Sequence, residues 1–532
     1  MELNLRDQNG YSACLPDVNS FPIETDLYNQ KESITKAVII AAGNGSRLRG
    51  HQTNRPKPLV NVGGLPLLKR VILSAKKIGV TEFVIVLGYQ AAHIRKSINA
   101  KKMGVKITWV RNLEWRKPNG ISVLKAEKFV DGQFYLFMSD HVFAPQILEK
   151  LKDIGLAKHC GTLCVDYRLN KIQNLDDATK VRTDNGRLVD LGKSLTDFNA
   201  IDVGIFICTP ELFDALRRSH DAGAYTLSDG VRILAQEGKM CTFNIGNDYW
   251  QDVDTIPDVY AAERLLLRST RSEGDGFIAK HLNRKISNRI TKWLLKTPIT
   301  PNQISILNFV LSLFTAWLVS FGKPMTTIFG GIFFQLASIL DGCDGEVALI
   351  KLNDSKFGAF IDTLTDHLSY FVFVIGLTLG VYQATQNESV FYITGIVLGS
   401  LLFALTFGLL YIKKKGSASL RVLNKNIDSL NHPGQNKFMR FLTSLNSFGR
   451  RDFFAFAAMV VMLFGSIQLI YWMVMVAVAL MATGIAITSI YLLSKQFKFS
   501  LLSPFRKLQD WLSNWFDAPK SINLETEQEI PD

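Results

Sequence analysis

The hydrophobic positions divide this chain into two halves with different patterns. Up to about residue 270, short apolar runs rich in β-branched and aromatic residues alternate with helical patterns. Intervening helical segments such as Leu65–Ile78 imply βαβ units, so we predict an α/β Rossmann-like domain with a mainly parallel sheet. The predicted strands are Lys36–Ala41, Glu82–Leu87, Val105–Val110, Phe134–Met138, Gly161–Val165 and Val203–Ile207.

Beyond residue 270 the pattern changes to a polar linker followed by an amphipathic segment. Ser269–Gly276 is polar throughout, and Phe277–Lys296 mixes Lys and Arg with Ile, Leu and Trp at helical spacing. We expect this segment to be an amphipathic helix on a membrane surface. The alternative is a soluble helix that packs on the first domain.

Six long apolar stretches follow and predict an all-α six-helix transmembrane domain. Basic residues flank one set of loops, including Lys413–Lys415 and Arg450–Arg451, whereas the opposite loops carry little charge. By the positive-inside rule both termini and the first domain are expected to be cytoplasmic, in an integral inner-membrane protein. The predicted spans are 304–322, 327–348, 357–382, 390–412, 453–467 and 470–494.

These patterns define the expected domain organisation. We predict a polar extension over 1–35, an α/β domain over 36–268, a linker and interfacial helix over 269–298, and a membrane domain over 299–496. A second interfacial helix and an acidic tail then occupy 497–532, and Phe497–Phe516 is the helical part.

Composition narrows the class of protein. Hydrophobic residues make up 47% of the 532 residues, which is high for a purely soluble protein. The first 35 residues have neither a basic nor an apolar region, so a cleaved signal peptide is not expected. The six cysteines include no CxxC pair, which favours a reducing compartment. The net charge of +13 lies largely beside apolar spans, so we expect anionic lipid and phosphorylated substrates rather than nucleic acid as partners.

Four aspartates inside the apolar half are the strongest chemical signal. Asp341 and Asp344 stand three residues apart and Asp362 and Asp366 four apart, so each pair shares one face of its helix. A carboxylate at the bilayer centre costs about 2.5–3.5 kcal/mol on the insertion scale, so four together need compensation. Oxygen ligands select Mg²⁺, with Mn²⁺ as an alternative, and a metal at this place suggests chemistry on a phosphate.

A glycine-rich turn after the first strand marks a second phosphate site. Gly43 and Gly45 follow Ala41 in a loop whose backbone N–H groups would be exposed to phosphates. Arg47 and Lys57 would add positive charge for a triphosphate and its transition state. A tight turn without function is the alternative.

These blocks, AAGNGSRL and RPKPLVNVGGLPLL, resemble the signature of the sugar-phosphate nucleotidyltransferases, and in particular cytidylyltransferases that act on small phosphorylated alcohols. The resemblance implies CTP as substrate, Lys57 and Arg47 as catalytic residues, and nucleotide binding at Ala41, Gly43 and Gly45. It also implies metal binding by Asp140 and Asp254, with Asp252 as the rival of Asp254. A helix-cap or solvated role is the alternative for the latter two.

Three smaller blocks resemble the inositol-phosphate branch of that family. Asn119, Gly120 and Ser122 suit hydrogen bonding to a base or a polyol, and Lys180 suits a substrate phosphate, although it could be an ordinary surface lysine. The third block contains Asp202 and Gly204.

The four aspartates resemble the signature of the CDP-alcohol phosphotransferases, and Thr297–Ser305 resembles that family's entry to its first span. The resemblance implies two metal ions at Asp341, Asp344 and Asp362, with Asp366 completing the site and acting as base. It also implies close approach of the helices and the pyrophosphate at Gly345 and Gly358, and a homodimer.

One position departs from that signature. The arginine expected after Ala348 is replaced by Leu349, and Lys351 could substitute for it. Arg450 and Arg451 are further candidates for substrate phosphate, or they serve only topology.

Together the two signatures resemble a bifunctional enzyme. The first half would make CDP-inositol from CTP and inositol-1-phosphate. The second would transfer phospho-inositol to the hydroxyl of an inositol phosphate with release of CMP. One alternative is the same fusion acting on another polyol phosphate or a lipid acceptor. Another is a membrane-anchored nucleotidyltransferase with an inactive second half.

Overall fold

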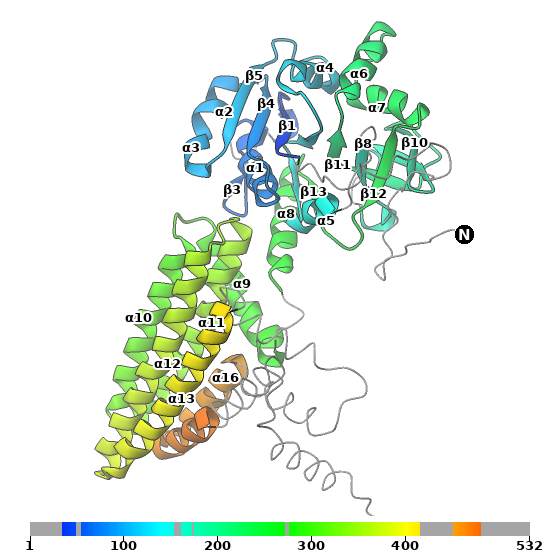
Figure 1. The fold of residues 1–532 in the computed structure, drawn as a ribbon. Coiled ribbons are helices and arrows are strands. Elements are labelled where there is room, and N and C mark those ends of the chain that lie inside the picture. Colours follow the sequence, from blue (N-terminus) through cyan, green and yellow to red (C-terminus); the bar gives the residue numbers. More distant parts are fainter. Residues whose placement is uncertain are drawn as a thin grey trace, which may run out of the picture. The chain divides into compact units, whose positions relative to one another are not determined.

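The computed structural model describes residues 34–48, 55–153, 161–172, 175–271, 276–414 and 451–479. They belong to two compact units, one ending at Ser269 and the other starting at Thr270, with Ile350–Leu352 grouped with the first (Figure 1). Arg450, the predicted helix Phe497–Phe516, the acidic tail and most of the N-terminal extension lie outside the described residues.

The first unit is built on one nine-stranded sheet. Its strand order is β5-β4-β1-β6-β11-β8-β12-β10-β9. Two small sheets accompany it, one of β2 and β3 and one of β7 and β13. The strands are β1 (Lys36–Ala41), β2 (Asn61–Val62), β3 (Leu65–Pro66), β4 (Glu82–Leu87), β5 (Lys106–Arg111), β6 (Phe134–Met138), β7 (His141–Phe143), β8 (Gly161–Asp166), β9 (Lys180–Asp184), β10 (Arg187–Gly192), β11 (Ala200–Cys208), β12 (Met240–Asn244) and β13 (Trp250–Asp252).

Helices cover both faces of this sheet, because the strands are apolar on both sides. Along β1, Ala37 and Ile39 face one core and Val38 and Ile40 the other. The first core is completed by α1, α2 and α5, and the second by α4, α6 and α7 (Figure 1). The helices are α1 (Leu67–Lys77), α2 (Ala91–Ser97), α3 (Ala100–Met103), α4 (Asn119–Leu124), α5 (Pro145–Asp153), α6 (Glu211–Asp221), α7 (Leu227–Gln236) and α8 (Ile256–Ser269).

The prediction of a mainly parallel sheet holds for only half of it. Strands β5, β4, β1 and β6 are parallel, whereas β11 runs antiparallel to both β6 and β8. The six strands expected from apolar runs are all present. Strands β9, β10 and β12 were not expected, and β9 and β10 are partly exposed along one face.

The second unit is helical. Its first long helix begins with a capping box, in which Thr300 and Gln303 satisfy each other's backbone N–H groups and Pro301 occupies the first turn. The helices are α9 (Arg284–Leu294), α10 (Pro301–Ser320), α11 (Pro324–Ile350), α12 (Lys356–Thr385), α13 (Ser389–Lys414) and α16 (Arg451–Met462). A further helical segment covers 467–479.

Within the described part, three helices are long and apolar enough to cross a membrane: α10, α11 and α12. Shorter apolar stretches cover Ser389–Ser400, Asp452–Met462 and Ile467–Ala479. The structure therefore supports a helical domain with at least these three spans, and the count of six remains a prediction.

The amphipathic segment before the first span is helical, as expected. A π-helical turn over Ala279–Asn283 leads into α9, whose buried Ser287 and Thr291 contact Glu346 of α11. Its Trp293 stays 63% exposed. The buried face of α9 is thus polar and packs on a helix of its own unit.

Close packing of α10 against α12 depends on glycine. A Cβ on Gly376 would lie 2.5 Å from the carbonyl oxygen of Ala316, which is backbone and cannot give way easily. We expect Gly376→Ala to lower the unfolding temperature of the detergent-purified protein, since overpacking costs about 1–3 kcal/mol.

Gly395→Ala is the matched control, because a Cβ there would meet no heavy atom within 4 Å in the part of the chain that the structure describes. It should leave the unfolding temperature unchanged or raise it slightly. Equal unfolding temperatures for the two variants would contradict the tight α10–α12 contact.

Candidate active sites

The first candidate site forms where β1 ends and the glycine-rich loop begins. Gly45 has a φ of +57°, a conformation that L side chains rarely adopt. A Cβ on Gly45 would lie 2.4 Å from Cβ of Lys57, so only glycine lets the loop pass over this lysine. Lys57 itself opens a short 3-10 turn, Lys57–Leu59, fixed by Pro56 before it.

Lys57 lies among three carboxylates. Its Nζ is 2.6 Å from Oδ2 of Asp140, 2.5 Å from Oδ1 of Asp254 and 3.8 Å from Oδ1 of Asp252. Burial disfavours the charged amine, but the three carboxylates outweigh it and hold the pKa of Lys57 well above its ordinary value. The lysine is therefore a permanent cation with an 11% exposed side chain.

The pairing of two short strands brings the carboxylates together. Asp140 follows β6, and the antiparallel pair of β7 and β13 sets His141 opposite Asp252. His141 Nδ1 lies 2.9 Å from Oδ1 of Asp140, and its ring stacks on Trp250. Burial disfavours the imidazolium, yet the charges of Asp252 and Asp140 raise the pKa of His141 to about 9.

Three of these residues suit a metal ion. Ligand atoms of Asp140, His141 and Asp252 all lie within 4.8 Å of one another. Oδ1 of Asp252 is buried and accepts no hydrogen bond from the described residues, which is costly for a carboxylate unless a cation compensates it. Asp254 instead pairs with Lys57 and, at 3.2 Å, with Arg47. The geometry thus favours Asp252 as the partner of Asp140, and Asp254 remains the alternative.

Arg47 belongs to a second cluster around Asp177. Its Nη1 lies 2.5 Å from Oδ2 of Asp177, and Nζ of Lys193 lies 2.7 Å from Oδ1 of the same carboxylate. Lys180 donates to the backbone carbonyl of Lys193 at 3.0 Å. Three cations therefore gather beside the site. Asp177 lies three residues before Lys180, which the sequence singled out, but Lys193 lies in no motif and carried no signal in the sequence.

Among the remaining predicted nucleotide residues, Ala41, Gly120 and Ser122 are buried, whereas Gly43 and Asn119 are exposed. Asn119 accepts a hydrogen bond from the backbone N–H of Leu227, and Ser122 accepts one from the side-chain amide of Asn112. Gly120 lies so close to Tyr225 that a Cβ would be 2.6 Å from its carbonyl oxygen. Ala41 is buried at the end of β1, and a Cβ on Gly43 would meet no heavy atom of the described residues within 4 Å. Their nucleotide contacts remain predictions.

The block that contains Asp202 and Gly204 lies beside His141 of the first candidate site. Gly204, with a φ of +75°, lies against the ring of His141, and its N–H donates to Asp202 at 2.6 Å. Burial raises the pKa of Asp202 to about 6. The register of β11 against β8 shifts between Asp202 and Phe206, the stretch that contains Gly204.

The second candidate site lies in the helical unit. Carboxylate oxygens of Asp341 on α11 and of Asp362 and Asp366 on α12 lie within 4.8 Å of one another, so these two consecutive helices converge there. Such crowding of like charges needs a cation, and carboxylate ligands suit Mg²⁺ or Mn²⁺.

The fourth aspartate has a different neighbour. Asp344 is 5% exposed, and its Oδ2 accepts a hydrogen bond from Ser305 of α10 at 2.5 Å. A Cβ on Gly358 would lie 3.0 Å from Oδ1 of Asn302, consistent with a close approach at the start of α12. The space around Gly345 is open, with no heavy atom of the described residues within 4 Å of such a Cβ, so it does not serve helix packing.

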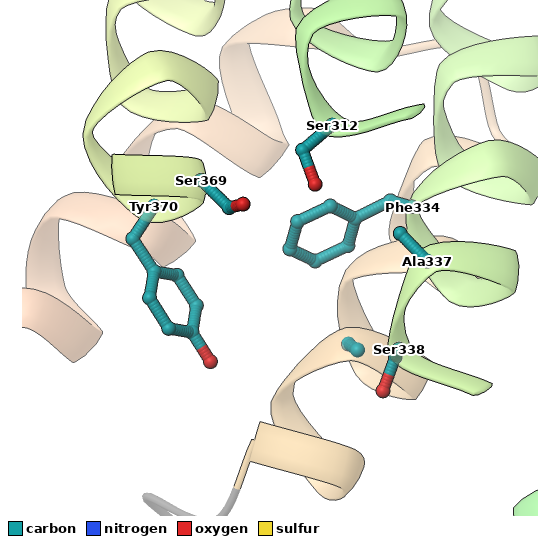
Figure 2. Close-up of a pocket in the computed structure, with 7 residues that line it drawn as sticks. Ser312, Phe334, Ala337, Ser338, Ser369 and Tyr370 are labelled. Carbon is teal, nitrogen blue, oxygen red and sulfur yellow. The ribbon is translucent and has the colours of Figure 1, made fainter. Parts of the chain in front are cut away.

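A pocket lies among α10, α11, α12 and α16 (Figure 2). Ser338 precedes Asp341 by three residues and Ser369 follows Asp366 by three, so each shares a helix face with its aspartate. The hydroxyl groups of Ser312 and Ser369 donate to carbonyls of their own helices, and the walls offer mainly apolar surface. The pocket, about 280 Å³ counting the space open to solvent, is lined by Ser312, Phe334, Ala337, Ser338, Ser369, Tyr370 and Ala455.

Arg451 opens α16, and Lys351 follows the end of α11. Partial burial lowers the pKa of Lys351. Their contacts with substrate remain predictions.

Family models match both halves. Residues 37–229 match the MobA-like NTP transferase domain, and residues 298–426 match the CDP-alcohol phosphatidyltransferase family. The fold and the two carboxylate sites therefore define a nucleotidyltransferase joined to a CDP-alcohol phosphotransferase.

Relatives with the same arrangement cover most of the chain. A protein of Archaeoglobus fulgidus named bifunctional IPC transferase and DIPP synthase is 32% identical over 467 residues, 87% of this chain and 85% of that protein. A protein of the same name from Thermococcus kodakarensis is 32% identical over 77% of this chain and 89% of its own length. This chain belongs to the family of bifunctional IPC transferases and DIPP synthases, and it is an enzyme with both transferase domains.

A solved structure resembles the first unit. The inositol-1-phosphate CTP transferase from T. maritima is 25% identical, covers 44% of this chain and 96% of its own, and superimposes with a TM-score of 0.40.

Lys57 is expected to be essential to one activity only. Because its ammonium is surrounded by Asp140, Asp252 and Asp254, Lys57→Ala should lower CTP turnover by at least about a hundredfold, as losses of a positioned charge do. Consumption of added CDP-alcohol, followed as CMP release, should stay at the wild-type rate.

Lys96→Ala, at an exposed position of α2, is the control and should change neither rate. Loss of both activities in Lys57→Ala would count against two independent sites.

The first activity should need more metal at low pH. Burial raises the pKa of Asp252 to about 6, so below that pH a proton competes with the cation for this carboxylate. We expect the Mg²⁺ concentration for half-maximal CTP turnover to rise as the pH falls from about 7.5 to about 5.5. In Asp252→Asn the dependence should become weaker and retain only the part contributed by CTP and by the other titrating groups of the site, such as His141. Identical pH dependence in the variant and the wild type would show that Asp252 is not a ligand.

Proposed function

We propose that this chain makes CDP-inositol from CTP and inositol-1-phosphate, and then transfers phospho-inositol to a hydroxyl group of an inositol phosphate. In the first step a phosphate oxygen of inositol-1-phosphate attacks the α-phosphorus of CTP, and pyrophosphate leaves. In the second step the acceptor hydroxyl attacks the inositol-bearing phosphorus of CDP-inositol, and CMP leaves. The observation that carries this proposal is the presence of two separate carboxylate clusters, one in each transferase domain.

In the first site the chain's cations bind and orient the triphosphate. Lys57 is buried, positively charged and beside Asp140, so it can stabilise the charge that develops at the α-phosphate. Arg47 and Lys193 pair with Asp177, Lys180 donates to the backbone carbonyl of Lys193, and the three cations suit the phosphates of the two substrates. Asn119, Gly120 and Ser122 are proposed to contact the base or the polyol.

Metal binding is proposed at both sites. Asp140 with Asp252 or Asp254 would hold it in the first, and Asp341, Asp344, Asp362 and Asp366 in the second. When bound, Mg²⁺ neutralises phosphate charge and polarises the phosphorus–oxygen bond that breaks.

In the second site Asp366 is proposed to take the proton of the acceptor hydroxyl. It lies on α12 one turn beyond Asp362, on the face that meets Asp341. Gly345 leaves open space beside Asp344 into which a pyrophosphate can approach.

The identity of the alcohol is supported by the relatives. Proteins named bifunctional IPC transferase and DIPP synthase match both halves of this chain in one alignment. The fusion itself supports a shared intermediate, because it raises the concentration of CDP-alcohol near its consumer.

The membrane arrangement follows from the same domains. We propose six spans, cytoplasmic termini, a cytoplasmic nucleotidyltransferase domain and a homodimer formed through the membrane domain. The three long apolar helices and the basic flanking residues support this topology.

Asp366→Asn should separate the two steps. Removing the base is expected to slow CMP release by at least about a hundredfold, since general bases contribute typically 10²–10⁴-fold. Pyrophosphate release from CTP and inositol-1-phosphate should persist, so CDP-inositol should accumulate and be seen by mass spectrometry.

Glu388→Gln, an exposed acidic position outside both clusters, is the control. If Asp366→Asn still releases CMP at the wild-type rate, Asp366 is not the base. Wild-type protein that accumulates CDP-inositol without CMP would point to a lipid or another acceptor, or to an inactive second half.

A further inference from the structure

A buried ion pair joins α9 to the aspartate signature of α11. Glu346, two residues after Asp344, is only 1% exposed. Its Oε1 accepts hydrogen bonds from Nη1 of Arg284 at 2.6 Å and from Oγ of Ser287 at 2.7 Å, and its Oε2 accepts one from Oγ1 of Thr291 at 2.6 Å. A carboxylate buried this deeply is held by three donors from one face of one helix.

The guanidinium also lies against the signature itself. Nη1 of Arg284 is 3.7 Å from the position that a Cβ would take on Gly342. Gly342 is the neighbour of Asp341, which belongs to the carboxylate cluster. Arg284 therefore brings a positive charge to the first turn of the signature from outside it.

The positive charge of Arg284 matters because the four-aspartate signature of this chain lacks the arginine of the family pattern. Leu349 occupies the position at which the family pattern carries arginine, and its side chain is 52% exposed. A leucine can neither bind a phosphate nor balance a carboxylate. A guanidinium has five donors in a planar fork, so it can hold a carboxylate on one edge and a phosphate on another.

We infer that Arg284 contacts the pyrophosphate of the CDP-alcohol in this chain, taking over the task of the missing signature arginine, and that Glu346 positions it. The inference rests on the proposed function of the four-aspartate site. Arg284 has a 19% exposed side chain, so part of it remains accessible while Glu346 holds the rest. Ser287 and Thr291 fix the carboxylate of Glu346, so the guanidinium is oriented before substrate arrives.

The kinetic test uses added CDP-inositol and follows CMP. Arg284→Ala should raise KM for CDP-inositol by at least about tenfold with a smaller change in kcat, because it removes a charged hydrogen bond to bound substrate. Arg284→Lys should recover part of the loss, since lysine keeps the charge but not the fork. Glu346→Gln should raise KM severalfold through misplacement of Arg284.

A double variant separates binding from anchoring. Arg284→Ala alone leaves a buried carboxylate uncompensated and could unfold the helix pair, whereas Arg284→Ala with Glu346→Gln removes both charges. The double variant should fold and still show the raised KM. Its unfolding temperature should also rise less with added CDP-inositol than that of the wild type, which reports binding without turnover. A double variant with wild-type KM would show that the pair is only an anchor, and would overturn the inference.

Two further variants complete the design. Arg289→Ala removes an exposed cation from the same helix and should leave KM unchanged. Asp341→Asn tests the proposed function separately. If it leaves CMP release intact, the four-aspartate site is not the transferase site. If it abolishes CMP release while Arg284→Ala does not alter KM, only the assignment of Arg284 fails. If Lys351→Ala raises KM and Arg284→Ala does not, Lys351 rather than Arg284 replaces the signature arginine.

Discussion

The cost of crowding carboxylates is the constraint on which both halves of this molecule depend. A carboxylate removed from water is stable only beside a cation or several hydrogen-bond donors. In the first unit Lys57 and His141 supply the positive charge for Asp140, Asp252 and Asp254. In the helical unit carboxylate oxygens of Asp341, Asp362 and Asp366 lie within 4.8 Å of one another, which is why a divalent cation is central to the account.

The same constraint explains which helices pack tightly. Ser305 of α10 donates to Asp344, and Arg284 of α9 donates to Glu346, so polar contacts tie two helices to the signature helix α11. In an apolar surrounding such contacts are specific, because an unpaired polar group there is costly. The glycine contacts of α12 with α10 then bring Asp362 and Asp366 to the same place.

Much of this could be predicted from the sequence. Runs such as Lys36–Ala41 are apolar on both faces, so they identified buried strands, and the spacing of the four aspartates placed them on shared helix faces. The glycine-rich loop and Lys57 were recognisable because their chemistry needs particular residue types in a fixed order. The family comparisons agree with the two transferase activities expected from these signatures.

The rest depended on contacts that no local pattern contains. The antiparallel half of the sheet includes strands such as β9 and β10, which are partly exposed along one face and so lack a continuous apolar run. The pairing of β7 with β13 brings Asp252 to His141 over more than a hundred residues, so the sequence left Asp252 and Asp254 equivalent. Lys193 and Arg284 stand outside every motif, and only the fold brings them to Asp177 and Glu346.

The most direct test of the account is one reaction of the detergent-purified protein with Mg²⁺, CTP and inositol-1-phosphate, followed by mass spectrometry and phosphate analysis. The account predicts pyrophosphate and CDP-inositol first, then CMP together with a di-inositol product that carries one phosphodiester and one phosphate monoester. Absence of pyrophosphate would contradict the assigned alcohol or nucleotide, and pyrophosphate without any CMP would contradict the sequential action of two sites in one chain.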